Sequence, residues 1–230
     1  MRIVDSKVLN SFSPTKVFFY RIDPEDVTQT LEDILRSIMN KSWLSKFDKN
    51  YARMAFESRA QKTIEDIKNK FGECANDRVT SEAGEYVVSE LARKTIVSQL
   101  NYLDIPLAEL LGKKCSGNPG FDFHSQNIND NVIIFGEAKY KSNETASSVA
   151  LAQIADFVRA KKDIEDLPDL EDFCSELALQ NVSDKGIKGF AAAFSAKKTS
   201  TDRIIKNITK REDFKYLVKF KEMILVAVNI

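Results

Sequence analysis

Apolar residues along the chain occur either in short continuous runs or at the three- and four-residue spacing of a helix, a mixture typical of an α/β protein. Short apolar runs predict strands at residues 17–22, 120–124, 132–141 and 223–230. Helical spacing predicts helices at residues 27–39, 51–70, 81–100 and 149–162, and a short helical turn at 107–111. The sequence therefore predicts an α/β fold.

The segment from Val132 to Lys141 changes character part-way along. It begins with the apolar run Val-Ile-Ile-Phe, which is typical of a strand covered on both faces, and continues as Gly-Glu-Ala-Lys. Because strand side chains alternate, Glu137 and Lys139 are expected on one face. A polar turn at residues 125–131 separates this strand from the strand at 120–124. A hairpin of the two strands would bring Asp122 beside Glu137 and Lys139.

Such a cluster of charges has a specific chemical meaning. Two neighbouring buried carboxylates repel each other unless a proton or a cation lies between them. Carboxylate oxygens are suitable ligands for Mg²⁺ or Mn²⁺, and a nearby lysine can stabilise negative charge that develops on a phosphate. The alternative, a surface ion pair at the end of a strand, remains open because Glu-x-Lys is a common pattern.

Composition excludes several classes of protein. The chain has 230 residues, 43% of them apolar and 30% charged, which is typical of a globular protein. The three cysteines form no Cys-x-x-Cys pair and there is one histidine, so we expect no zinc site and a reducing compartment. No apolar run is long enough for a signal peptide core or a membrane span. We therefore expect a cytoplasmic protein.

The formal net charge of zero hides a local excess of positive charge. Residues 185–221 carry eleven basic and three acidic side chains, interleaved with aromatic residues that include Phe190, Phe194, Phe214 and Tyr216. This pattern predicts a surface that binds nucleic-acid phosphates. Solvated faces of helices give the same pattern, so both interpretations stay open. The candidate nucleic-acid-binding residues are Lys197, Lys198, Arg203 and Lys206.

Asp122, followed on the next strand by Glu137-x-Lys139, resembles the signature of the PD-(D/E)xK nuclease superfamily. The proline of that signature would be Pro119, three positions before the aspartate. The predicted order helix, strand, strand, helix is also the superfamily's core order, and the resemblance covers residues 81–162. It implies a restriction-endonuclease-like core at residues 76–230, with a small mixed sheet flanked by helices. Residues 1–75 would be an N-terminal α/β extension that covers the core or docks a partner.

The resemblance also implies a catalytic site. Asp122, Glu137 and the carbonyl group of Ala138 would bind Mg²⁺ or Mn²⁺, and Lys139 would stabilise the reacting phosphate. Members of the superfamily often add a carboxylate from the preceding helix, and Gly84-Glu85 fits that position, which makes Glu85 a further catalytic and metal-binding candidate. The alternative for Glu85 is that acidic residues suit a helix N-terminus.

Three other residues bear on this site. Gly84 costs a helix about 1 kcal/mol relative to alanine, which predicts close approach of a ligand or of another backbone. Some members carry a glutamine in a Gln-x-x-x-Tyr-like pattern on the helix after the Glu-x-Lys strand. Gln153 fits the glutamine, but Phe157 stands in place of the tyrosine, and a solvent-facing glutamine is the equal alternative. His124 is expected on the same strand face as Asp122, either near the phosphate or in a structural hydrogen bond.

Within the superfamily, the pattern Ser-Glu-Ala-Gly-Glu, Gly-Phe-Asp-Phe-His and Phe-Gly-Glu-Ala-Lys-Tyr-Lys is similar to the HamA-like nuclease subunit of Hachiman anti-phage defence systems. That similarity implies a DNA substrate and a separate helicase (ATPase) partner that controls the nuclease. Two alternatives remain open. The chain could be a ribonuclease, because such a site does not sense the 2′-hydroxyl group, or a nuclease-fold interaction subunit without catalysis.

Overall fold

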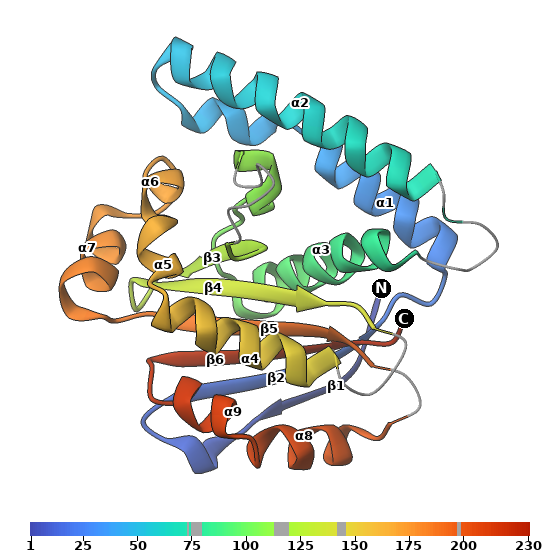
Figure 1. Ribbon diagram of the computed structural model, residues 1–230, viewed down its shortest axis with the longest axis vertical. Coiled ribbons are helices and arrows are strands. Elements are labelled where there is room, and N and C mark those ends of the chain that lie inside the picture. The colour runs from blue at the N-terminus through green and yellow to red at the C-terminus, as the bar shows by residue number, and fades with distance from the viewer. Residues whose placement is uncertain (73, 75–79, 113–119, 142–145, 197–198) are drawn as a thin grey trace.

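The computed structural model describes residues 1–72, 74, 80–112, 120–141, 146–196 and 199–230 (Figure 1). Its centre is one six-stranded sheet with the strand order β1-β2-β6-β5-β4-β3. Strands β2, β6, β5 and β4 run parallel to one another, and each outermost pair is antiparallel. The strands are β1 Arg2–Val8, β2 Lys16–Asp23, β3 Phe123–Asn127, β4 Val132–Lys139, β5 Gly189–Ser195 and β6 Glu222–Val228.

Helices cover both faces of this sheet, which confirms the predicted α/β class and the mixed, helix-flanked sheet (Figure 1). Helix α3 (Ser81–Leu100) packs on one face, with α1 (Val27–Met39) and α2 (Asn50–Gly72) outside it. Helix α4 (Ala146–Arg159) packs on the other face. The smaller helices of the same side are α5 (Lys162–Glu165), α6 (Leu167–Leu170), α7 (Glu176–Lys185), α8 (Thr201–Thr209) and α9 (Glu212–Leu217). Short 3₁₀ turns are η1 (Asn10–Phe12), η2 (Ser42–Lys46) and η3 (Ala108–Leu111).

Several predicted elements are confirmed nearly to the residue. Helices α1 and α3 cover the segments whose helical spacing predicts them, and each is capped by a side chain: Asp26 accepts from the backbone N–H of Gln29, and Thr80 from that of Ala83. The Asp-Pro-Glu-Asp segment at residues 23–26 predicts a helix start with Pro24 in the first turn, but α1 begins only at Val27. The apolar run of β4 is buried throughout between the helices on the two faces, as its sequence predicts.

Strand β5 corrects the interpretation of the basic C-terminal region. Its sequence Gly-Phe-Ala-Ala-Ala-Phe-Ser pairs with β4 on one side and β6 on the other, and every residue is buried. Phe190 and Phe194 therefore belong to the core beside α4, and Phe214 of α9 joins them. These rings are not available to contact a duplex. Tyr216 is half-buried and packs on Phe220.

The predicted boundary between β3 and its turn is wrong. Residues 125–127 were expected in the turn but form the second half of β3, and α4 begins at Ala146 rather than Val149. Polar residues are tolerated in β3 because their side chains have partners: Ser125 donates to the carbonyl oxygen of Leu103, and Gln126 exchanges hydrogen bonds with Ser175. The turn starts only at Ile128.

The first third of the chain contributes both to the sheet and to the outer helical layer. Strand β2 pairs in parallel with β6, and β1, which was not predicted, forms the outer edge. Ile34 of α1 and Ile67 of α2 are buried in the core on the α3 side. Within the described ranges, the helices are all too short or too polar to cross a membrane.

Candidate active site

Asp122 lies immediately before β3, at the edge of the sheet where β4 ends. Its backbone N–H donates to the carbonyl oxygen of Gly136 at 2.8 Å. Its carboxylate oxygen Oδ2 accepts from the backbone N–H of Ala138, also at 2.8 Å. Phe123 pairs with Gly136, so extending this register by one residue would set Asp122 opposite Glu137. The predicted hairpin is present and brings Asp122 to the Glu-x-Lys segment.

Glu137 and Lys139 lie on the same face of β4, and their side chains form an ion pair. Lys139 Nζ donates to Glu137 Oε1 at 2.7 Å. The Glu137 residue is completely buried, Asp122 is 4% exposed, and the Lys139 side chain is 12% exposed. The three charged groups therefore meet where solvent is largely excluded, and screening by water is weak.

The electrostatics of this cluster favour a charged lysine. Burial lowers the pKa of the Lys139 ammonium, but the carboxylates of Glu137, Asp122 and Glu85 outweigh that effect. The resulting pKa lies above the ordinary value for lysine. The cluster therefore favours the protonated, positively charged form of Lys139 at neutral pH.

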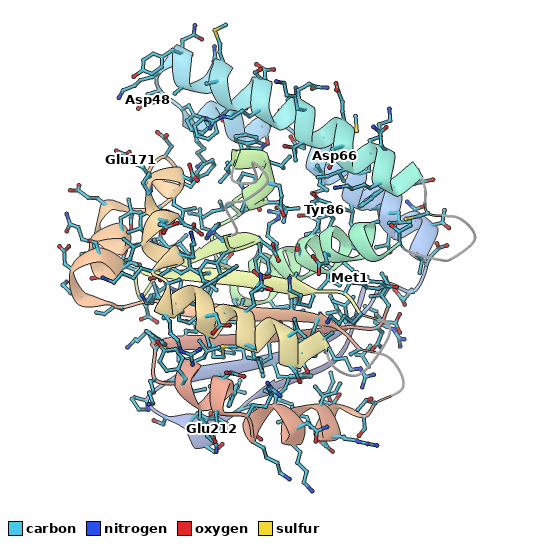
Figure 2. The ribbon with its side chains drawn as sticks, viewed as in Figure 1. Met1, Asp48, Asp66, Tyr86, Glu171 and Glu212 are labelled. Carbon is cyan, nitrogen blue, oxygen red and sulfur yellow. The ribbon has the colours of Figure 1, made fainter. Side chains whose placement is uncertain are left out.

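Glu85 reaches the same cluster from α3. Its Oε1 lies 3.6 Å from Lys139 Nζ, and its side chain is 43% exposed. The next residue, Tyr86, lies on the side of α3 toward α2, with Lys70 Nζ 5.4 Å from its ring centroid (Figure 2). The structure thus brings together all four of the predicted catalytic side chains, namely Asp122, Glu137, Lys139 and Glu85.

Gly84 allows a close contact between α3 and the end of β4, as its costly position in a helix predicts. A Cβ atom added at this position would overlap the ring of Tyr140, which follows Lys139 on the chain. The group that approaches Gly84 is therefore an aromatic side chain rather than a backbone or a ligand. This contact holds α3, and with it Glu85, close to the end of β4.

The two accessory candidates are less directly connected to the cluster. His124 is 1% exposed, and its Nε2 lies 3.0 Å from Asp166 Oδ2 in a buried pair, which favours the structural alternative. Gln153 is half-buried on α4, the helix that covers the sheet face shared by Glu137 and Lys139.

Of the candidate nucleic-acid-binding residues, Lys197 and Lys198 lie outside the described residues. Arg203 and Lys206 are exposed on α8, whose opposite side buries Ile204 and Ile208. An ion pair of 2.6 Å between Lys7 of β1 and Asp202 ties the start of this helix to the sheet. The two cations are thus presented to solvent on a helix that packs firmly on the core.

No protein-family model, curated protein or solved structure matches this chain. The function has to be inferred from the geometry and chemistry of the residues themselves.

The carboxylates of the cluster are oxygen donors that a divalent cation could use. Across the described ranges, no group of three or more His, Cys, Asp or Glu side chains is arranged to hold a metal ion. Mg²⁺, however, commonly uses only one or two protein carboxylates and completes its shell with water and phosphate oxygens. The buried carboxylates of Asp122 and Glu137, which belong to adjacent segments, supply hard oxygen donors of that kind. Their chemistry fits Mg²⁺ or Mn²⁺.

Proposed function

We propose that this chain is a metal-dependent nuclease that cleaves DNA phosphodiester bonds. The observation that carries the proposal is the meeting of Asp122, Glu137 and Lys139 in a buried cluster at the end of β4. Buried carboxylates placed beside one another cost free energy, and clusters of this kind are concentrated at functional sites. The proposed core is restriction-endonuclease-like, with α3, β3, β4 and α4 around the site.

The roles of the residues follow from their chemistry. Asp122, Glu137, the carbonyl group of Ala138 and Glu85 would hold Mg²⁺ or Mn²⁺, which supplies Lewis-acid stabilisation of a phosphate and a more acidic water. Lys139, which is held in its charged form by the surrounding carboxylates, would stabilise negative charge on the phosphate in the transition state. Exposed cations on α8, Arg203 and Lys206, would bind the DNA backbone.

We further propose that the chain is the effector nuclease subunit of an anti-phage defence complex of the Hachiman type, controlled by a helicase partner. This part rests only on the resemblance of the short motifs around Glu85, Asp122 and Glu137. It predicts that a helicase purified together with the chain changes the rate of cleavage or the DNA form that is cleaved.

The test is cleavage of plasmid DNA, linear DNA and RNA by the purified chain, with Mg²⁺ or Mn²⁺ and with a chelator. Asp122→Asn and Glu137→Gln should each lower the cleavage rate by at least about a hundredfold, whereas the exposed Glu176→Gln should leave it unchanged. Asparagine is preferable to alanine at position 122, because alanine would leave the buried N–H of Ala138 without its acceptor and cost about 1–3 kcal/mol.

The possible outcomes separate the candidate activities. Cleavage by both variants at the wild-type rate would refute the assigned site. Cleavage of RNA but not of DNA would make the chain a ribonuclease with the same site.

One observation favours the non-catalytic alternative, a nuclease-fold interaction subunit. Lys139 already pairs with Glu137 and Glu85, so part of the buried negative charge is neutralised without a metal. Isothermal titration calorimetry with Mg²⁺ and Mn²⁺ distinguishes the two functions. An interaction subunit should show no binding that depends on Asp122 and Glu137, whereas the proposed nuclease should.

A further inference from the structure

The end of β4 that carries Lys139 is held by side chains of its two neighbours. On the β5 side, the register of the ladder ends with Lys139 opposite Phe194. Beyond Lys139 the contact between the two segments is made by a side chain. The hydroxyl group of Ser195 accepts from the backbone N–H of Lys141 at 2.9 Å and donates to the carbonyl oxygen of Lys141 at 2.7 Å. On the β3 side, the Asp122 carboxylate accepts from Ala138. The strand end is thus fastened from both directions.

Ser195 is itself firmly placed. It is 6% exposed and pairs with Val228 of β6, and the next residue, Ala196, donates its N–H to the carbonyl oxygen of Val228 at 2.6 Å. The Ser195 hydroxyl group both donates a hydrogen bond to the backbone of Lys141 and accepts one from it. Lys141 is therefore anchored to the centre of the sheet.

We propose that Ser195 is a positioning residue for Lys139 in the nuclease reaction, an inference that rests on the proposed function. Lys139 is two residues before the anchored Lys141, and the intervening Tyr140 packs against Gly84 of α3. These contacts fix the backbone from which the Lys139 ammonium reaches Glu137. A displacement of about 1 Å in a catalytic group can cost about a hundredfold in rate, so losing the hydroxyl should be visible in the chemical step.

The test compares Ser195→Ala with Ser195→Thr, which keeps the hydroxyl group. The matched control is Ser183→Ala, because Ser183 is exposed on α7 and its hydroxyl bonds only within that helix end. Hydrogen exchange of the Lys141 amide, measured by NMR, should be about tenfold faster in Ser195→Ala and unchanged in the other two variants. This arm needs no enzymatic activity.

The kinetic arm separates positioning from folding. Ser195→Ala should lower kcat by about ten- to a hundredfold, with KM and DNA affinity within about twofold of wild type, and Ser195→Thr should restore kcat. In a Lys139→Ala background, Ser195→Ala should cause no further loss, because its effect passes through the lysine. If the cleavage rate of Lys139→Ala is below detection, the double variant cannot be compared. The positioning role is then tested by whether Ser195→Ala changes kcat but not KM, and by whether Ser195→Thr restores kcat.

Three results would overturn the proposal. The first is an unchanged exchange rate of the Lys141 amide in Ser195→Ala, which would show that the hydroxyl does not hold the strand end. The second is a loss of DNA affinity in Ser195→Ala as large as the loss of kcat. Equally contrary would be a Ser195→Ala substitution that lowers kcat as much in the Lys139→Ala background as it does in the wild type. The third is a wild-type chain without nuclease activity, which refutes the proposed function as well, while the exchange arm still reports whether the strand end is anchored.

Discussion

Replacing Lys139 by methionine removes one positive charge from a buried cluster while keeping an unbranched apolar side chain. In the wild type, the ammonium lies 2.7 Å from Glu137 Oε1 and 3.6 Å from Glu85 Oε1. The Glu137 side chain is 1% exposed, so water cannot replace the lost partner. The variant therefore leaves a buried carboxylate next to Asp122 without its nearest compensating cation.

The expected cost follows from the burial of each pair. Removing one partner of a buried ion pair costs about 3–5 kcal/mol, which applies to Lys139 and Glu137. Glu85 is 43% exposed, so its pairing with Lys139 adds less than about 1 kcal/mol. For a chain of this length, about 1 kcal/mol shifts Tm by about 2–4 °C, so a total loss of about 3–6 kcal/mol should make Lys139→Met melt about 6–24 °C below wild type.

The pH dependence has a definite sign. The folded-state pKa of Lys139 lies above its unfolded value, because the attraction of Glu137, Asp122 and Glu85 exceeds the opposing effect of burial. Its stabilising contribution is therefore complete below the unfolded pKa and is lost as the pH rises through the folded pKa. The part of the stability difference between wild type and Lys139→Met that comes from the ammonium should be constant around neutral pH and shrink in strongly alkaline buffer.

A divalent cation should reverse the defect if the cluster binds one. A ligand that binds only the folded state adds about 2.7 kcal/mol at a hundredfold excess over Kd, so Mg²⁺ or Mn²⁺ should recover much of the lost stability. Cleavage should nevertheless remain about 10²–10³ times slower than wild type, because the metal does not replace the ammonium at the phosphate. Lys139→Arg should restore cleavage poorly, since a planar fork does not reproduce a compact charge.

The assay is thermal unfolding monitored by circular dichroism, with chelator and with metal. The control is Lys215→Met on α9, whose partner Glu212 is also exposed (Figure 2). That pair has a distance of 2.6 Å with 53% and 85% exposed side chains, so its loss should cost less than about 1 kcal/mol. If Lys139→Met were no less stable than Lys215→Met, the ammonium would not compensate the buried carboxylates. If metal stabilised neither variant nor wild type, the cation site would be refuted.

Two further predictions concern other parts of the molecule. Reversing the charges of Arg203 and Lys206 on α8 should weaken DNA binding at all sequences and reduce the salt slope by about one counterion per lost contact; an unchanged slope would show that they are only a solvated face. Tyr102 donates to the buried Glu222 carboxylate at 2.6 Å, so Tyr102→Phe should cost about 1–3 kcal/mol in urea unfolding, whereas the exposed Tyr51→Phe should cost almost nothing. Burial raises the pKa of Glu222, and its hydrogen-bond donors, Tyr102 first, oppose that effect. Folding stability therefore falls as the pH rises from the unfolded pKa of Glu222 to its higher folded pKa. Because Tyr102 stabilises the ionised carboxylate, the Tyr102→Phe loss should be larger at neutral than at acidic pH, and equal losses would contradict this explanation.

An element could be predicted from the sequence when residues within or next to it determine its structure. It could not be predicted when its structure depends on pairing with distant segments. Helices α1 and α3 were predicted closely because the helical spacing of their apolar residues lies within each segment, and their caps, Asp26 and Thr80, directly precede it. Strand β5 was missed because alanine and glycine have low strand propensity, and only its position between β4 and β6 accounts for it. Strand β1 was missed because it is an edge strand, with half of its residues exposed and no continuous apolar run.

The same distinction applies to the site. Side-chain alternation within one strand was enough to place Glu137 and Lys139 on a common face, and the hairpin brought in Asp122. Contacts between distant segments were beyond the sequence: His124 pairs with a residue 42 positions away, and Ser195 with one 54 positions away. Those contacts depend on the order of strands in the sheet and on where α5 and α6 pack.

The composition of this cluster distinguishes it from other buried ion pairs in the same molecule. Lys188 pairs with Asp163, and Arg93 pairs with both Glu90 and Asp104. At the end of β4, the carboxylates of Glu137, Asp122 and Glu85 all act on the ammonium of Lys139, and Glu137 and Asp122 are buried. Buried charges are costly in a purely structural role, where apolar residues of similar volume are often at least as stable. Carboxylate oxygens gathered at one point are the donors that Mg²⁺ uses, so the recovery of Lys139→Met by Mg²⁺ is a direct test of the proposed site.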